Sequence, residues 1–283
     1  MYQKFIKQSE GIIGQSIDHW EDVRGGDTSS ALKLVSGRRN LFLKYLTSPT
    51  LHGMYQKEVM GLKLISMVGC VKTPKIIGYG TDFLLLEFID DEPDKNRYFW
   101  QEFAADLAKM HRQSWDKFGL DHSNFIGQLP QSNTPKESWS AFYAWERLIP
   151  QLKMAVERSI FSQDDTAAFE SLCRKVSDIC PEEPPALIHG DLWSGNFLCN
   201  QQREVVLIDP AVSFAHREMD LAMSRLFGGF PDHFYKYYEE HFPLQPGFEQ
   251  RCSFYQLYYL MVHLNLFGSS YLPSVRQILR RYA

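Results

Sequence analysis

The stretch LIHGDLWSGNFLCNQQREVVLIDPA, residues 187–211, carries most of the information about the fold. An apolar segment ends in the triplet HGD at 189–191, and Asn196 follows its aspartate by five positions (196 − 191 = 5). A second apolar segment, 205–208, delivers Asp209 thirteen positions after the asparagine (209 − 196 = 13). Polar side chains that directly follow buried strands are held firmly at the edge of a cleft. The pattern therefore predicts short strands around a loop that carries a site.

This spacing matches the needs of phosphoryl transfer. One carboxylate accepts the proton of the acceptor hydroxyl, while an Asn and an Asp supply oxygen ligands to the Mg²⁺ that bridges nucleotide phosphates. The run H-x-D-x-x-x-x-N, followed by an aspartate after a strand, is typical of the catalytic and metal-binding loops of kinases. The alternative is that Asp191 and Asn196 only cap turns, as Asp and Asn often do. Three residues at two fixed spacings favour the functional interpretation.

The N-terminal third has the pattern of a small sheet with one helix. Alternating apolar and polar residues predict two β-hairpins, and apolar residues at helical spacing predict a helix between them. The expected elements are a short strand at 20–23, a hairpin of 30–35 and 40–46, a helix at 54–68, and a hairpin of 75–79 and 83–88. A turn-rich stretch at 90–96 predicts a linker. We expect an N-terminal lobe, residues 1–89, that binds a nucleotide.

Helical patterns dominate from residue 96 onward. The expected helices are 96–114, 137–160 with a kink or a split at Pro150, 164–179, 218–227, 231–240, 248–267 and 273–282. The predicted fold class is α+β: a small antiparallel β lobe with one helix, and a larger, mainly helical lobe at 90–283 for catalysis and substrate binding.

The first lobe is expected to supply a phosphate clamp. Lys44 lies inside an apolar strand, where a lysine is unusual, and is the candidate to reach the α- and β-phosphates. Glu58 follows fourteen residues later (58 − 44 = 14) and is the only acidic residue of the expected helix, so it is the best partner for Lys44. The alternative for Glu58 is a solvated helix carboxylate.

Two more segments are candidates for nucleotide contacts. The first comprises Gly25, Gly26, Asp27 and Thr28, whose backbone N–H groups can turn toward a triphosphate, although Gly-Gly is also a common hairpin turn. The sequence contains neither a full G-x-G-x-x-G nor a Walker A motif. The second segment comprises Glu87, Phe88 and Ile89, which are placed at the lobe junction to offer backbone groups to an adenine edge.

Composition limits the partners and the compartment. The 283 residues contain 30 Lys and Arg against 34 Asp and Glu, a formal net charge of −4, so nucleic acid and anionic membranes are poor candidates. Five cysteines without a CxxC pair argue against a disulfide framework. We find no apolar stretch long enough for a membrane helix and no secretory signal, and we therefore expect a cytoplasmic protein. The oligomeric state stays open.

Several motifs give residues 20–270 a resemblance to the fructosamine kinase family (fructosamine/ketosamine 3-kinases). The motifs are HGDLWSGN at 189–196, DPA at 209–211, REMDLAM at 217–223, LFGGF at 226–230 and HLNLFG at 263–268. This family is a branch of the protein-kinase-like fold that includes aminoglycoside and choline phosphotransferases. The resemblance implies a two-lobed kinase-like fold and ATP-dependent phosphorylation of the 3-hydroxyl of a small-molecule ketosamine, a glycation adduct of the fructosamine or ribulosamine type, which promotes deglycation.

The same resemblance implies roles for the candidate residues. Asp191 would accept the proton, Asn196 and Asp209 would bind Mg²⁺, and Lys44 and Glu58 would form the phosphate-orienting pair. Residues 87–89 would contact ATP. Asp220 matches a carboxylate that braces the catalytic loop, and His189 would orient that loop.

The acceptor side is less defined by the sequence. Trp193 is a candidate to stack on a sugar or amine, and His263 is a candidate to line the acceptor pocket with Trp139 and Asn133. His216 and Arg217 closely follow the metal aspartate and are candidates to meet the phosphate or the substrate. The alternative for these side chains is packing or loop support.

Two other functions stay open from the sequence. The first is phosphorylation of an aminoglycoside or a choline-like amino-alcohol. The second is a non-catalytic, ATP-binding pseudokinase, against which the intact set of Lys44, Asp191, Asn196 and Asp209 argues.

Overall fold

The computed structural model describes residues 2–23, 30–46 and 51–283. These residues form two compact units, of which the first is Met1–Phe99 with Gly195–Pro210 and the second is Trp100–Ser194 with Ala211–Ala283. The expected phosphate loop at residues 25–28 lies outside the described residues. The lobe boundary between residues 89 and 90 stays a prediction, and each unit is described below by itself.

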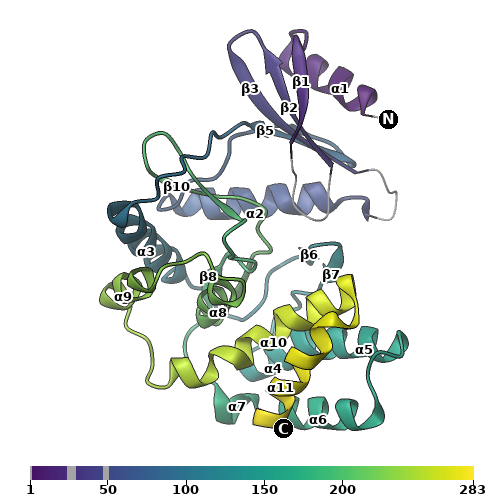
Figure 1. Ribbon diagram of the computed structural model, residues 1–283, viewed down its shortest axis with the longest axis vertical. Coiled ribbons are helices and arrows are strands. Elements are labelled where there is room, and N and C mark those ends of the chain that lie inside the picture. The colour runs from purple at the N-terminus through teal and green to yellow at the C-terminus, as the bar shows by residue number, and fades with distance from the viewer. Residues whose placement is uncertain (1, 24–29, 47–50) are drawn as a thin grey trace. The chain divides into compact units, whose positions relative to one another are not determined.

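The first unit is built on a five-stranded antiparallel sheet in the order β1-β2-β3-β5-β4 (Figure 1). Its strands are β1 His19–Val23, β2 Ser30–Ser36, β3 Arg39–Tyr45, β4 Ile76–Tyr79 and β5 Phe83–Glu87. Both predicted hairpins, β2–β3 and β4–β5, are present, and β3 joins them by pairing with β5. The predicted antiparallel sheet is therefore confirmed.

Helix α1, Gln3–Ile13, packs against the sheet and was not predicted from the sequence. Its Phe5 and Ile6 lie in a buried cluster with side chains from β2, β3 and β5, namely Leu32, Leu34, Leu41, Leu43, Tyr45, Phe83 and Leu85. Successive side chains of a strand point to opposite faces, so Leu43 faces this cluster and Lys44 faces the other side of the sheet. That side carries helix α2, Met54–Val68, whose bounds are those predicted.

A hairpin from late in the chain also belongs to the first unit. Strands β9, Phe197–Cys199, and β10, Val205–Leu207, pair antiparallel. The Leu207 N–H donates to the Lys72 carbonyl at 2.9 Å, and the Glu92 N–H donates to the Cys199 carbonyl at 2.8 Å. Residues 195–210 are thus tied by backbone hydrogen bonds to the segments that follow α2 and β5.

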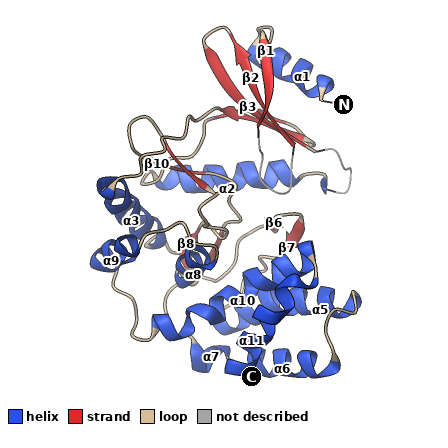
Figure 2. Cartoon of the chain, in the orientation of Figure 1, coloured by secondary structure: helices blue, strands red, loops and turns tan. Residues whose placement is uncertain are grey.

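The second unit is mainly helical (Figure 2). Its helices are α3 Arg97–His111, which starts at the end of the first unit, α4 Trp139–Phe142, α5 Ile149–Glu157, α6 Gln163–Arg174, α7 Val176–Ile179, α8 Glu218–Leu226, α9 Asp232–His241, α10 Phe248–Phe267 and α11 Leu272–Tyr282. A 3₁₀ turn, η3 Ser269–Tyr271, precedes α11. Two antiparallel pairs complete the unit: β6 Asn124–Ile126 with β7 Leu129–Gln131, and β8 Ala186–Ile188 with β11 Ser213–Ala215. None of the described helices combines the length and the apolar character that crossing a bilayer requires.

The helix predicted over 137–160 is divided into three parts. Between α4 and α5 lies a six-residue π-helix, η2 Tyr143–Leu148. Pro150 occupies the first turn of α5. The expected kink or split at Pro150 is present as a split, because one helical element ends at Leu148 and the next begins at Ile149.

Candidate active site

Lys44 is the centre of an ion cluster in the first unit. Its Nζ donates to both carboxylate oxygens of Glu58 at 2.9 Å and to Oδ1 of Asp209 at 2.8 Å. Lys44 is 4 % exposed, whereas the Asp209 side chain keeps 31 % of its surface in solvent. The expected contact between Lys44 and Glu58 is therefore present, and Asp209 joins it from 165 positions away in the chain.

The electrostatics of this cluster follow from burial and charge. Burial by itself would lower the pKa of Lys44, but the carboxylates of Asp209 and Glu58 outweigh it and hold that pKa well above its usual value. Burial raises the pKa of Glu58 to about 7, against the opposing effect of Lys44. Lys44 is thus a cation at neutral pH, and it faces two carboxyl groups.

Asn196 and Asp209 lie at the same end of the β9–β10 hairpin. The Ile208 N–H donates to the Asn196 carbonyl at 3.1 Å, which places the residue before β9 opposite the segment that follows β10. Asp209 has a φ of 54°, in the left-handed region. A residue other than glycine costs about 1–3 kcal/mol there and persists only when its surroundings impose it.

Asp220 fixes the backbone of the HGD triplet in the second unit. Its Oδ2 accepts from the His189 N–H at 2.7 Å, and its Oδ1 accepts from the Gly190 N–H at 2.8 Å. The His111 ring approaches the same carboxylate, Nε2 to Oδ2, at 3.1 Å. Asp220 is completely buried, and it holds the loop in the way that the sequence led us to expect.

Asp191 follows this braced backbone and remains partly exposed. Its N–H donates to Nδ1 of His189 at 3.3 Å. On α10, burial holds the pKa of Tyr259 well above its usual value, and the carboxylates of Asp220 and Asp191 add to this effect. His263 lies one turn further along α10, and its Nδ1 contacts the Tyr259 carbonyl at 2.8 Å.

The surroundings of His263 are aromatic. Its ring centroid is 4.7 Å from that of Phe227, 5.4 Å from that of Phe267 and 5.2 Å from that of Tyr271. Phe227 is 42 % exposed and Phe267 is 48 % exposed, which is unusual for large apolar rings. Rings that stay in contact with solvent next to a histidine can receive the apolar face of a ligand.

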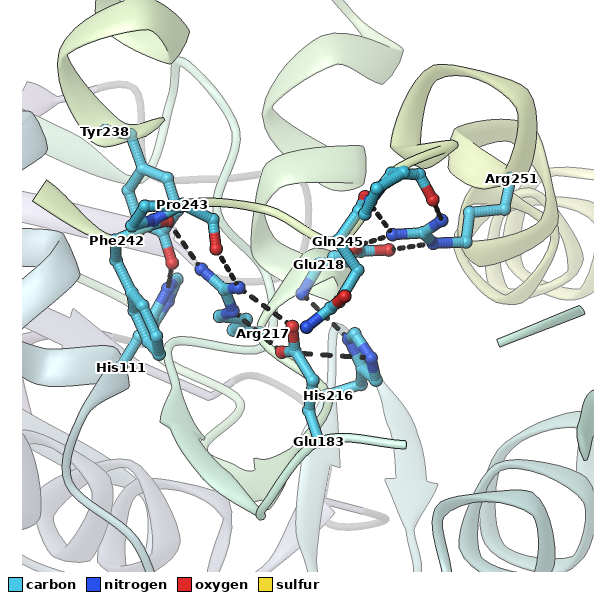
Figure 3. Close-up of polar contacts among 11 residues, drawn as sticks. His111, Glu183, His216, Arg217, Glu218, Tyr238, Phe242, Pro243, Gln245 and Arg251 are labelled. Carbon is cyan, nitrogen blue, oxygen red and sulfur yellow. Dashed lines mark hydrogen bonds and ion pairs between the residues drawn. The ribbon is translucent and has the colours of Figure 1, made fainter. Parts of the chain in front are cut away.

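His216 and Arg217 have internal partners in the second unit (Figure 3). The Arg217 guanidinium donates to both carboxylate oxygens of Glu183, at 2.7 and 2.8 Å, and to the carbonyls of Phe242 and Pro243. The His216 ring is fully buried and packs beside Trp139. Arg251 pairs with Glu218 in the same region. These contacts support the chain between β11 and α8, so we leave His216 and Arg217 out of the substrate residues proposed below.

Because His216 is buried, we expect the protein to lose stability at acidic pH. Burial lowers its pKa to about 4, so its neutral form stabilises the fold above its unfolded pKa of about 6.5, and that stabilisation is lost as the pH falls toward 4. We expect His216→Asn to flatten the pH dependence of the unfolding free energy by about 2–3 kcal/mol between pH about 7.5 and about 4.5. Urea denaturation at both pH values measures this difference. The exposed His241, changed to Asn, serves as the control, and equal pH dependence of wild type and His216→Asn would contradict the prediction.

Residues 87–89 end the sheet of the first unit. The Glu87 N–H donates to the Lys75 carbonyl at 2.9 Å, and the Phe88 N–H donates to the Asn40 carbonyl at 3.1 Å. The sheet thus uses these two donors. The groups of this segment that are left for the expected contact with adenine are therefore the Ile89 N–H and the backbone carbonyls of residues 87–89.

The fold and these side chains define a class of protein, the kinase-like phosphotransferases. The structure matches an ADP-bound aminoglycoside phosphotransferase, APH(2'')-Ib, with a TM-score of 0.66 at 12% identity, covering 99% of this chain and 96% of that one, which shows the fold. It matches a protein of Thermobifida fusca YX-ER1 assigned as a fructosamine-3-kinase with a TM-score of 0.89 at 31% identity, covering 97% and 96% of the two chains.

Sequence comparison identifies the family. The model of the fructosamine kinase family matches residues 1–283, so the chain belongs to this family and is an ATP-dependent phosphotransferase. It is 37% identical over 272 residues to a protein of Lactiplantibacillus plantarum named probable ketoamine kinase, covering 94% of this chain and 95% of that protein. It is 31% identical to the ketosamine-3-kinase of Mus musculus, covering 90% and 92%.

Proposed function

We propose that this protein transfers the γ-phosphoryl group of ATP to the 3-hydroxyl of a small-molecule ketosamine. The observation that carries the proposal is the Lys44–Glu58–Asp209 cluster, because a buried lysine held by a helix carboxylate and a loop aspartate is the arrangement that kinases use to orient phosphates. Membership of the fructosamine kinase family supports the ketosamine as acceptor.

The residues of the first unit fit a magnesium site. Asp209 keeps nearly a third of its side chain exposed, and Asn196 lies at the same end of the hairpin, so the two offer the hard oxygen ligands that Mg²⁺ takes. We propose that they hold Mg²⁺, which would neutralise charge on the nucleotide phosphates. Lys44 would donate to the α- and β-phosphates, and the Gly25–Thr28 segment and residues 87–89 would contact the triphosphate and the adenine.

Asp191 is the proposed catalytic residue of the second unit. Asp220 fixes the backbone on which it stands, so its carboxylate can meet the acceptor hydroxyl in one orientation. A carboxylate so placed aligns the hydroxyl and accepts its proton as the phosphoryl group is transferred.

The acceptor is proposed to contact Trp193 and His263. Trp193 follows Asp191 by two positions and is partly exposed, and His263 stands among the exposed rings of Phe227 and Phe267. Aromatic faces suit the apolar face of a sugar and the substituent of its amine.

The chemistry of the product supports this choice of hydroxyl. A phosphate on C3, next to the C2 ketone of a ketosamine, is a far better leaving group than a hydroxyl. Its loss lets the adduct break down and release the amine, which is deglycation. We place this activity in the cytoplasm, a reducing compartment in which the free cysteines of the chain would stay reduced.

A substrate screen tests the proposal. ATP consumption is measured with ribulosamine, fructosamine, an aminoglycoside and choline, and the position of the phosphate in the product is mapped. We expect turnover of a ketosamine with phosphate on O3, and at least tenfold lower activity with the other two classes. A preference for the aminoglycoside or for choline would show that the proposed substrate class is wrong. ATP binding without any phosphoryl transfer would indicate a pseudokinase.

A further inference from the structure

Two buried amide side chains of the second unit, Asn124 and Gln131, form hydrogen bonds with the segment that contacts the HGD loop. Asn124 in β6 and Gln131 in β7 stand directly opposite each other in the β6–β7 hairpin. Gln131 is 3 % exposed and Asn124 is 4 % exposed. Buried amides destabilise a fold unless they are fully hydrogen-bonded, so the partners of this pair show what it holds.

Gln131 uses all of its polar atoms. Its Nε2 donates to Oδ1 of Asn124 at 2.8 Å and to the carbonyl of Ala211 at 3.1 Å. Its Oε1 accepts from the Tyr258 hydroxyl at 2.6 Å. Asn124 in turn donates to the carbonyl of Val212 at 2.8 Å. The pair therefore fixes two successive carbonyls of the segment that follows Pro210.

The network is anchored at its far end by a buried guanidinium. Arg147, in the π-helix η2, donates to Oδ1 of Asn133 at 2.7 Å, and Asn133 donates to Oδ1 of Asn124 at 3.0 Å. Arg147 also donates to the Ser213 hydroxyl at 3.2 Å. Each donor thus has an acceptor, and the network has one arrangement.

Ala211 connects this network to the HGD loop. Its N–H donates to the His189 carbonyl at 2.9 Å. Gly190 has a φ of 84°, and a Cβ added to it would collide with the carbonyl oxygen of Ala211, the same oxygen that accepts from Gln131. The backbone of Gly190, just before Asp191, is thus in close contact with the Ala211 carbonyl, and the hydrogen bond from Gln131 fixes the position of that carbonyl.

We propose that Gln131 is a positioning residue for phosphoryl transfer: by holding the Ala211 carbonyl under Gly190, it fixes the backbone that carries Asp191. The Asp220 carboxylate holds this backbone by accepting hydrogen bonds from the N–H groups of His189 and Gly190. The Ala211 N–H holds the same backbone by donating to the His189 carbonyl. The inference rests on Asp191 being the proton acceptor proposed above. Gln131 touches neither substrate in this scheme and acts only through Ala211.

The test compares two buried glutamines. Gln131→Leu removes the donor to Ala211, whereas Gln151→Leu removes a glutamine of α5 that is 2 % exposed and whose Oε1 accepts from Asn265. Both changes remove buried hydrogen bonds, so thermal unfolding should register both. We expect Gln131→Leu to lower kcat by about ten- to a hundredfold, with the KM for ATP changed less than threefold, because a small misplacement of a reacting group has effects of this size. Gln151→Leu should keep kcat within twofold.

A second measurement separates this inference from the proposed function. Amide hydrogen exchange of the peptide that covers residues 187–193 should rise at least tenfold in Gln131→Leu and stay unchanged in Gln151→Leu. Unchanged exchange and unchanged kcat in Gln131→Leu would overturn the positioning role. Faster exchange in an enzyme that does not phosphorylate ketosamines would leave positioning intact and overturn the substrate.

A milder variant keeps the test decisive if Gln131→Leu does not fold. Tyr258→Phe removes only the hydroxyl that binds Oε1 of Gln131. We expect a two- to fivefold fall in kcat with a smaller rise in exchange at 187–193, and wild-type values for both would contradict the proposal.

Discussion

Asp191→Asn is expected to bind ATP with wild-type affinity and to transfer phosphate about 10²–10⁴ times more slowly, the range that general base catalysis contributes. The amide has the size of the carboxylate but cannot accept the proton of the acceptor hydroxyl. The loop should keep its shape, because Asp220 holds it through the backbone N–H groups of His189 and Gly190 and not through the side chain of Asp191.

Steady-state kinetics with the best ketosamine of the screen, together with calorimetric titration of ATP, measure the two quantities separately. Asp178→Asn is the matched control, since Asp178 is an exposed aspartate of the same unit. If Asp191→Asn turned over at close to the wild-type rate, Asp191 would not be the proton acceptor.

Lys44→Met is expected to lower kcat/KM for ATP by about 10²–10³, the effect of removing one preorganised donor from a developing charge. It should also lower the unfolding free energy, because Glu58 and Asp209 then lose the cation that both contact. Kinetics and urea denaturation measure the two effects. Lys63→Met, which removes an exposed lysine of α2, is the control and should change neither quantity.

A double variant separates the two roles of Lys44. Glu58→Gln removes one of the two carboxylates that Lys44→Met leaves behind, so Lys44→Met/Glu58→Gln should be more stable than Lys44→Met alone. Its activity should stay low, because the donor to the phosphates is still absent. Recovery of both stability and activity in the double variant would show that Lys44 serves the fold and not the nucleotide.

The parts of the molecule that could be predicted from the sequence are those recognised from residues close to one another along the chain. The bounds of α2 and α10 follow from helical periodicity ended by Gly69 and Gly268. Lys44 was recognised because a charge inside an apolar strand requires a partner, and its contact with Glu58 is present. The spacing of the HGD loop and Asp209 likewise identified the kinase-like class, which the structural comparison confirms.

Other parts could not be predicted because their stability comes from distant residues. Helix α1 is the exception, because Phe5, Ile6, Ile12 and Ile13 recur at helical spacing and Gly14 ends the helix, a local signal that the prediction missed. The strands β6, β7 and β11 have three residues each, too few for any periodicity. Arg217 was expected near the phosphate or the substrate because it closely follows Asp209 in the sequence. Its partner Glu183 lies 34 positions earlier, which no local pattern reveals.

The return of residues 195–210 to the first unit has a practical consequence for dissecting this enzyme. A fragment cut at the turn-rich stretch 90–96 would contain Lys44 and Glu58 but neither Asn196 nor Asp209. The lysine would keep one of its two carboxylates, and the proposed magnesium ligands would be left on the other piece. An ATP-binding fragment therefore has to be spliced, with residues 195–210 grafted onto the N-terminal piece.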